Sequence, residues 1–387
     1  MWWDPYNLFR GSEFCAFWRD HLQGERSLLF IVGHGFDPRV LGPLREIVGA
    51  RADVPRYCVA LDMADCYETD EAASALRRAN AEGLAALFPG DALEVRRLTP
   101  ADADGIRNIS RNAVVALADV IGGADRFSDV VLDISALPRL VYLTLLNQLL
   151  AGFVARTESA PLASRPNLHV VYAEAAPIDA AIVKKEVDVD LAPIQNLSIR
   201  LDEEASLSWP VIWFPVLAED VSEQLVRIWE QINPDDVCPV LPIQSADPRR
   251  ADNIIRDLGE LVFDRFAIDP RDIIHATEWN PFQLYRSLLG AMARYEETLR
   301  FFGGARFVLS PLSSKSLSIG CLLACFEKRW RGSRTALRVG MAHVETRRYE
   351  AAALELTTLA QPISLWLTGG CYATESQQAA VFTGKEP

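Results

Sequence analysis

The stretch Asp129-Val-Val-Leu-Asp-Ile-Ser-Ala-Leu-Pro-Arg139 decides which fold this sequence predicts. Residues Asp129–Leu132 are typical of a short buried strand, and the apolar residues Leu140–Leu150 after the turn are typical of a helix. The turn itself carries Asp133 and Ser135 at the carboxyl end of the strand. Open α/β sheets bind ligands at that end, because the following helix offers unpaired N–H groups and a positive dipole end to an anion. The stretch therefore predicts an anionic ligand, with phosphate-bearing molecules first.

The second half of the chain repeats this arrangement. The strand Arg306–Leu309 leads into the turn Ser310-Pro-Leu-Ser-Ser-Lys315 and then into an apolar helix. This composition suits a phosphate, since Lys315 supplies a positive charge and Ser313 and Ser314 supply hydrogen-bond donors. Serines also cap helices, and that alternative explains the hydroxyl groups but not the lysine.

Strands and helices alternate along both halves of the chain. The predicted strands of the first half are 27–32, 57–62, 93–98, 130–133 and 168–173. Those of the second half are 210–215, 237–243, 306–309 and 337–344. Alternation with helices predicts parallel sheets that are covered on both faces. We expect an α/β fold of two Rossmann-like lobes with mainly parallel sheets. An internal structural duplication stays open, because the two halves show no sequence similarity.

The length of 387 residues predicts more than one domain, because a single core rarely serves more than about 250–300 residues. We expect an aromatic N-terminal extension (1–26), a first Rossmann-like domain (27–176), a connector (177–208) and a second Rossmann-like domain (209–387). The aromatic residues of the extension would anchor it on a domain or on a partner. A protein partner or a homo-oligomer is therefore expected.

Charge and composition exclude several classes of function. The formal charge of −13 and the isoelectric point near 5.0 argue against non-specific nucleic-acid binding and against acidic membranes, because both need a cationic surface. Without an apolar run that could span a bilayer or a signal-peptide pattern, we expect a cytoplasmic protein with no membrane partner. The seven cysteines form no CxxC pair and the five histidines are scattered. This spacing predicts reduced cysteines, no metal site and no cofactor.

The turn Gly33-His-Gly-Phe-Asp-Pro-Arg39, which follows the first strand, is another candidate ligand loop. Its candidate site residues are Gly33, His34, Gly35, Asp37 and Arg39. The glycines would let the backbone approach a ligand, and the other side chains carry functional groups. The loop matches neither the dinucleotide fingerprint nor a P-loop. The alternative is an ordinary turn in which the Asp-Pro pair caps the next helix, and it leaves the histidine and the arginine unexplained.

Three further residues, Asp133, Arg139 and Trp279, complete the candidate site. A carboxylate after an apolar strand costs desolvation unless it is paired, so Asp133 should bond backbone N–H groups, Ser135 or a cation. Arg139 fits a phosphate or Asp133 itself, and a purely turn-stabilising Asp133 remains the alternative. Trp279 lies next to Asn280, which we expect to cap a helix, and Trp279 is a candidate for stacking on a base.

The loop Asp133-Ile-Ser-Ala-Leu-Pro-Arg139 after its buried strand resembles the strand, loop and helix of CRISPR-associated Rossmann-like (CARF-type) sensor domains. In that family an Asp-x-Ser/Thr turn near a Gly-Gly-x-Lys cradle contacts cyclic oligonucleotides. The resemblance covers only this stretch, and Ala136, Leu137, Pro138 and Arg139 stand where the family usually has glycines and a lysine. It implies a nucleotide ligand and a prokaryotic anti-phage defence setting.

Two classes of function are compatible with these patterns. A sensor or adaptor would hold a nucleotide or another phosphate ligand and signal to a partner. An enzyme would act on a nucleotide or phosphorylated substrate, with His34 as general acid or base and Asp133 orienting it. A non-catalytic scaffold subunit is a third alternative. The sequence favours the sensor, because no complete catalytic constellation can be assembled from it.

Overall fold

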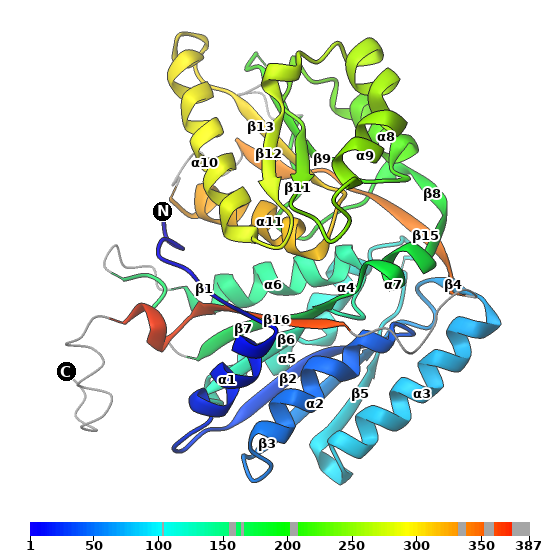
Figure 1. The fold of residues 1–387 in the computed structure, drawn as a ribbon, viewed down its shortest axis with the longest axis vertical. Helices are drawn as coiled ribbons and strands as arrows, with labels where there is room; N and C mark the ends of the chain where they lie inside the picture. The colour runs from blue at the N-terminus through cyan, green and yellow to red at the C-terminus, as the bar shows by residue number, and fades with distance from the viewer. Residues whose placement is uncertain are drawn as a thin grey trace. The chain divides into compact units, whose positions relative to one another are not determined.

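The structure, a computed structural model, describes residues 1–102, 104–154, 160–163, 166–201, 208–331, 338–351 and 360–373. The chain forms two compact units (Figure 1). The terminal domain combines Trp2–Lys185 with the segment that begins at Arg347, and the insert domain is Glu186–Thr346. Both are α/β domains with mostly parallel sheets, as the sequence predicts.

A seven-stranded sheet forms the centre of the terminal domain, in the order β1-β16-β7-β6-β2-β3-β5. The bounds are Asn7–Arg10 (β1), Gln361–Thr368 (β16), Asn167–Glu174 (β7), Asp129–Asp133 (β6), Leu28–His34 (β2), Arg56–Asp62 (β3) and Leu93–Arg97 (β5). The strands from β7 to β5 pair in parallel, whereas β16 is antiparallel to both β7 and β1.

Helices cover both faces of this sheet (Figure 1). On one face lie α1 (Ser12–His21), α2 (Leu41–Ala50) and α3 (Glu71–Leu87), and on the other α4 (Ile109–Ala116), α5 (Ala118–Gly122) and α6 (Arg139–Phe153). Alternate residues of β2, such as Phe30 and Val32, pack in the cluster that includes α1 and α2. A central parallel strand is buried from both sides, which explains why β2 is apolar without alternation.

The strand order of the terminal domain locates its ligand-binding edge. Numbered along the chain, the parallel strands β2, β3, β5, β6 and β7 stand in the spatial order 3-2-1-4-5. This is the doubly wound order, in which the winding direction reverses between the first and fourth strands. The carboxyl ends of β2 and β6 therefore flank the topological switch point, where such sheets bind ligands.

The insert domain contains a second sheet, in the order β12-β11-β9-β13-β14, with β10 beside β9. The strands are β9 (Val211–Val216), β10 (Asp236–Val237), β11 (Val240–Ile243), β12 (Ile274–Thr277), β13 (Arg306–Pro311) and β14 (Val339–Met341). All of these pairings are parallel. The helices are α8 (Ser222–Ile232), α9 (Arg250–Gly259), α10 (Pro281–Thr298) and α11 (Lys315–Arg331).

Leaving out the short β10, the insert sheet repeats the order 3-2-1-4-5 along the chain. Its switch point lies between β9 and β13, so the loop before α11 corresponds in topology to the loop before α6. Many unrelated domains share this topology. An internal duplication therefore stays a prediction.

The chain passes between the two units within β8 (Val183–Leu191) and β15 (Val344–Glu350). Together with β4 (Glu68–Thr69) these strands form a small three-stranded sheet. The helix α7 (Ala176–Ala181) precedes β8. The region expected to be a connector thus contains regular structure, and part of it belongs to the insert domain.

The structure divides the chain differently from the expected boundaries at both ends. The N-terminal extension is part of the terminal domain, since Trp3, Phe14 and Trp18 are fully buried there. The segment from Arg347 also joins the terminal domain, because β16 pairs with β7 and buries its apolar residues. These three aromatic residues of the extension are thus accounted for by the core of their own domain.

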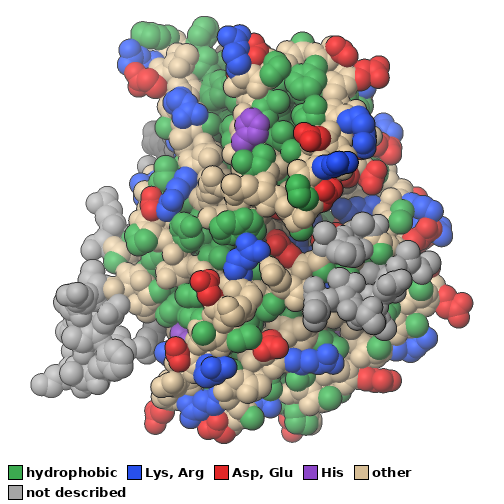
Figure 2. Space-filling view, in the orientation of Figure 1, with side chains coloured by type: hydrophobic (Ala, Val, Ile, Leu, Met, Phe, Trp, Pro, Cys, Tyr) green, Lys and Arg blue, Asp and Glu red, His purple; other side chains and the backbone are tan. Residues whose placement is uncertain are grey.

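Two observations describe the surface and the helices. Figure 2 shows acidic and basic side chains interspersed on the face in view rather than gathered in one basic patch. Among the described residues, no helix combines the length and the apolar composition needed to cross a membrane.

Candidate functional site

The switch point of the terminal domain is closely packed by its own loops. A Cβ atom built on Gly33 would lie 2.9 Å from the carbonyl carbon of Ala136, and one on Gly35 would lie 2.9 Å from the carbonyl oxygen of Ala136. Because these atoms belong to the backbone, the loop after β6 leaves no room for a side chain at either position. The approach of that loop accounts for both glycines, which the sequence had suggested as a place for a ligand.

Arg39 is occupied by carboxylates rather than exposed to a ligand. Its Nη2 atom donates to Asp37 Oδ2 at 2.7 Å, its Nε to Asp37 Oδ1 at 2.9 Å, and its Nη1 to Asp179 Oδ1 at 2.8 Å. The guanidinium side chain is 3% exposed. Burial opposes its charge, but the two carboxylates more than compensate and raise the pKa of Arg39. One cation with two carboxylates is a net negative group, which does not attract an anion.

Asp37 also has the role expected from the alternative interpretation of its loop. Its Oδ1 atom accepts a hydrogen bond from the Arg39 backbone N–H at 3.0 Å, which caps the short 3-10 turn Pro38–Val40. Asn80 of α3 donates to the backbone carbonyls of Gly35 and Asp37, at 2.9 and 3.0 Å. Asp37 therefore shapes the loop after β2.

His34 is half-buried at the end of β2, opposite Asp62 of β3. Burial lowers the pKa of His34, Asp62 partly opposes this, and Arg77 adds to it. Its Nδ1 atom is buried and has no hydrogen-bond partner among the described residues. The imidazole is therefore neutral near pH 7. The carboxylate that acts on it is Asp62, which the sequence interpretation had not named.

Asp133 and Ser135 are held within their own loop and the adjacent strand. Asp133 is fully buried, and its Oδ1 atom accepts a hydrogen bond from the Ser135 backbone N–H at 2.7 Å. The Ser135 hydroxyl oxygen accepts from the Ala173 N–H of β7 at 3.2 Å. This is the turn-stabilising role left open for Asp133. Arg139, which is half-buried, is the first residue of α6.

The corresponding loop of the insert domain leads directly into α11, which begins at Lys315. The Ser314 hydroxyl oxygen accepts from the Leu317 N–H at 3.4 Å, as in a weak helix cap. Ser313 is buried, and so is Ser316. The Ser316 hydroxyl group has no hydrogen-bond partner among the described residues, although it lies in the first turn of the helix. The helix start thus combines hydroxyl groups, a lysine and a positive dipole end.

A second group at the carboxyl edge of the insert sheet was not recognised from the sequence. Arg250, at the start of α9, contacts Glu278 after β12, and its Nε atom lies 2.9 Å from Glu219 Oε1 after β9. Trp279 follows Glu278, and the Asn280 side chain accepts from the Phe282 N–H at 3.1 Å, which is the expected cap of α10. The only sequence signal for this group was that Glu219 follows a predicted strand, since the strand before Glu278 was not predicted.

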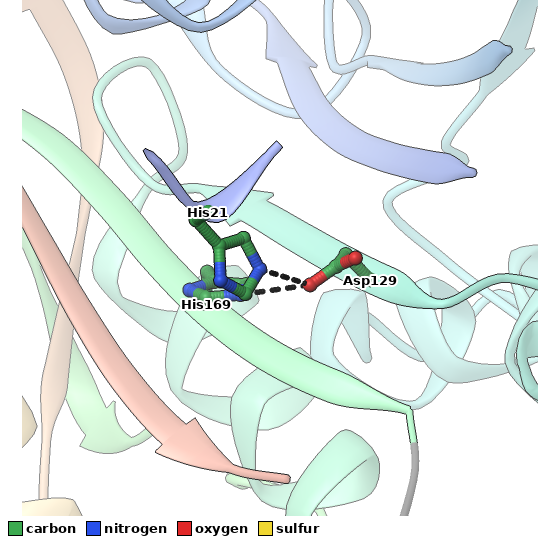
Figure 3. A group of neighbouring side chains, drawn as sticks. All are labelled: His21, Asp129 and His169. Carbon is green, nitrogen blue, oxygen red and sulfur yellow. Dashed lines mark hydrogen bonds and ion pairs between the residues drawn. The ribbon is translucent and has the colours of Figure 1, made fainter. Parts of the chain in front are cut away.

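Elsewhere in the terminal domain, two histidines and an aspartate meet at the opposite edge of the sheet (Figure 3). His21 Nε2 lies 2.6 Å from Asp129 Oδ1, and His169 Nε2 lies 3.2 Å from the same oxygen. Burial lowers the pKa of His169 to about 4, against the opposing effect of Asp129. Burial alone would raise the pKa of Asp129, but the hydrogen bonds from the two histidines keep it well below its usual range. The expectation of no metal site rested on sequence spacing, which could not show this cluster.

Comparison of the chain with models of known protein families and with curated proteins found no match. These two comparisons therefore assign no ligand or reaction to these residues.

Proposed function

We propose that this chain binds a phosphate-bearing ligand, foremost a nucleotide, and acts as a sensor or adaptor. The observation that carries the proposal is topological. In each domain the loop with hydroxyl groups and one cation follows the fourth strand in the order 3-2-1-4-5, beside the switch point. Ser135 and Arg139 stand there in the terminal domain, and Ser313, Ser314 and Lys315 in the insert domain. A role in prokaryotic defence depends on the CARF resemblance alone.

Of the two loops, the one in the insert domain is the better candidate for the ligand. In the terminal domain, the glycines face the backbone of the neighbouring loop and Arg39 is neutralised by two carboxylates. In the insert domain, the loop opens a helix of 17 residues, whose first N–H groups have no partner within the helix. Lys315 stands at that helix start, where a phosphate would meet both the dipole and the charge.

The direct test begins with the ligand itself. Mass spectrometry of small molecules released from the purified full chain would show whether a nucleotide accompanies it. Calorimetric titration with ATP, GTP and a cyclic oligoadenylate would then compare wild type with Lys315→Ala. We expect a loss of about 10- to 100-fold in affinity, because a hydrogen bond to a charged group contributes about 1.5–3 kcal/mol.

Lys328→Ala is the matched control for this test. Lys328 lies on the same helix, thirteen positions later, which corresponds to about 20 Å. Its Nζ atom pairs with Glu296 Oε2 at 2.6 Å. The control should bind like wild type. If Lys315→Ala binds the nucleotide as well as wild type does, the proposed site is wrong. If no nucleotide binds to the wild-type chain, the results favour the non-catalytic scaffold.

The enzyme alternative has one observation in its favour, which is the state of His34. The imidazole is neutral, and its buried Nδ1 atom, at the carboxyl edge of a sheet, has no hydrogen-bond partner in the part of the chain that the structure describes, so it has the protonation state of a general base. Asp62, opposite in the strand register, would orient it. If a nucleotide is turned over by wild type and bound but not turned over by His34→Gln, the protein is an enzyme rather than a pure sensor.

A further inference from the structure

Two imidazoles and one carboxylate converge at the amino-terminal edge of the terminal domain's sheet (Figure 3). His21 ends α1, Asp129 begins β6 and His169 lies in β7. Their ligand-type atoms all lie within 4.8 Å of one another, and the three side chains are 3%, 0% and 0% exposed. We propose that they bind a divalent transition-metal ion, with Zn²⁺ as the reference ion, which fastens α1 to the sheet.

The hydrogen bonding of Asp129 supports a cation at this place. Its Oδ1 atom faces three nitrogens: His21 Nε2 at 2.6 Å, Asn167 Nδ2 at 2.8 Å and His169 Nε2 at 3.2 Å. The Asn167 amide is oriented by the Gly370 N–H, which donates to its oxygen at 2.9 Å. A carboxylate oxygen has two lone pairs, so three N–H donors compete for them. A metal ion between the rings and the carboxylate removes this competition, because each ring then offers a lone pair in place of a proton.

The neighbours of Asp129 already orient it as an outer shell orients a metal ligand. Its second oxygen, Oδ2, accepts from the Ser128 hydroxyl group at 2.6 Å, which turns Oδ1 toward the histidines. Arg26 Nη1 lies 3.6 Å from Asp129 Oδ2, and its positive charge would repel a metal ion. The Arg26 side chain is 27% exposed, so solvent screens part of this opposition.

The distances fit a small metal ion after a modest shift. With metal–ligand bonds of about 2.0–2.2 Å in tetrahedral geometry, neighbouring ligand atoms stand about 3.3–3.6 Å apart. The His169–Asp129 separation of 3.2 Å is just below that range. His21 Nε2, at 2.6 Å from Asp129 Oδ1, must withdraw by about 0.7 Å or more to reach that range.

His21 lines an open, shallow hollow with Phe9, Phe17 and Trp366, and its ring would withdraw toward that hollow. The Trp366 ring lies edge-on to the His21 ring, with 4.7 Å between centroids. The hollow is a route by which a metal ion enters. It also leaves a coordination position for water, as expected for three protein ligands.

The test uses the full chain after treatment with a chelator and dialysis. Wild type should bind one equivalent of Zn²⁺ and should show a rise in thermal midpoint with added Zn²⁺. Co²⁺ should give visible absorption of a nitrogen- and oxygen-ligated site without thiolate charge-transfer bands. Those bands would assign the metal to cysteines and overturn the proposal. Wild type that takes up no Zn²⁺ or Co²⁺ would also overturn it.

His21→Gln separates metal binding from hydrogen bonding. The glutamine amide can still donate to Asp129 but is a poor metal ligand. We expect it to lose more affinity for Zn²⁺ than the roughly 10- to 100-fold that removal of an outer-shell partner costs. His275→Gln, at an exposed histidine of the insert domain, is the matched control and should bind as wild type does. Unchanged Zn²⁺ affinity in His21→Gln would overturn the proposal, and the wild-type spectrum decides the matter if this variant does not fold.

Discussion

Gly33→Ala should destabilise the terminal domain, because β2 and the loop after β6 meet there without room for a side chain. The added Cβ would lie 2.9 Å from the carbonyl carbon and oxygen of Ala136 and 3.0 Å from Leu137 Cδ2. Favourable contacts between carbon atoms lie at about 3.5–4.0 Å, so the loop must retreat by about half an ångström or more. Backbone atoms cannot rotate away as a flexible side chain can. Overpacking lowers the free energy of unfolding by about 1–3 kcal/mol, and we expect a loss of about 2–3 kcal/mol for Gly33→Ala because the clash is with backbone atoms.

Gly49→Ala in the same domain is the matched control for this substitution. Gly49 is exposed in α2, and no heavy atom lies within 4 Å of the position that a Cβ atom would take there, so alanine should stabilise the helix by up to about 1 kcal/mol. Urea and thermal unfolding should therefore show opposite signs for the two variants. For Gly33→Ala we expect the thermal midpoint to fall by about 4–12 °C, because each kcal/mol of lost stability lowers the midpoint of a domain of this size by about 2–4 °C. A Gly33→Ala protein as stable as wild type would refute the close approach of the two loops.

Substitutions at two further positions test other parts of the same edge. Arg39→Ala should cost about 3–5 kcal/mol in urea unfolding, because Asp37 would remain buried without its cation, and Arg39→Lys should cost less. The pKa of His34 is lowered by burial, so the folded state binds fewer protons than the unfolded chain. Stability should therefore fall as the pH decreases below about 6.5 and through the folded pKa. His34→Gln should reduce this slope, and an unchanged slope would contradict the assignment.

Local sequence signals predicted most strands of both sheets, because those signals depend on near neighbours, but they missed β1, β12 and β16. The run Leu28–Val32 is apolar because a central parallel strand is buried on both faces, and it became β2. Asn280 before Pro281 predicted the start of α10, and its side chain caps that helix. The domain assignment of the C-terminal segment could not be predicted in this way. It depends on β16 pairing with β7, nearly two hundred positions earlier in the chain.

The same limit applies to the candidate site. The sequence identified Arg39 as a possible anion ligand but could not show that Asp179, 140 positions away, would contact it. His21, Asp129 and His169 follow no metal-binding spacing, since 108 and 40 positions separate the contacting pairs. Strand register and helix docking bring such residues together, and neither is written in local composition.

The balance of charge at the carboxyl edge of each domain's sheet determines how an anion could bind. Arg39 stands with two carboxylates, and Arg250 likewise with Glu219 and Glu278. Each group is net negative, and the whole chain carries a formal charge of −13, so long-range attraction for an anionic ligand is weak. Binding must then depend on short-range contacts with N–H groups at a helix start and with a nearby cation. For this reason the affinity for a nucleotide should depend strongly on Lys315, and association should not be accelerated by lowering the salt concentration.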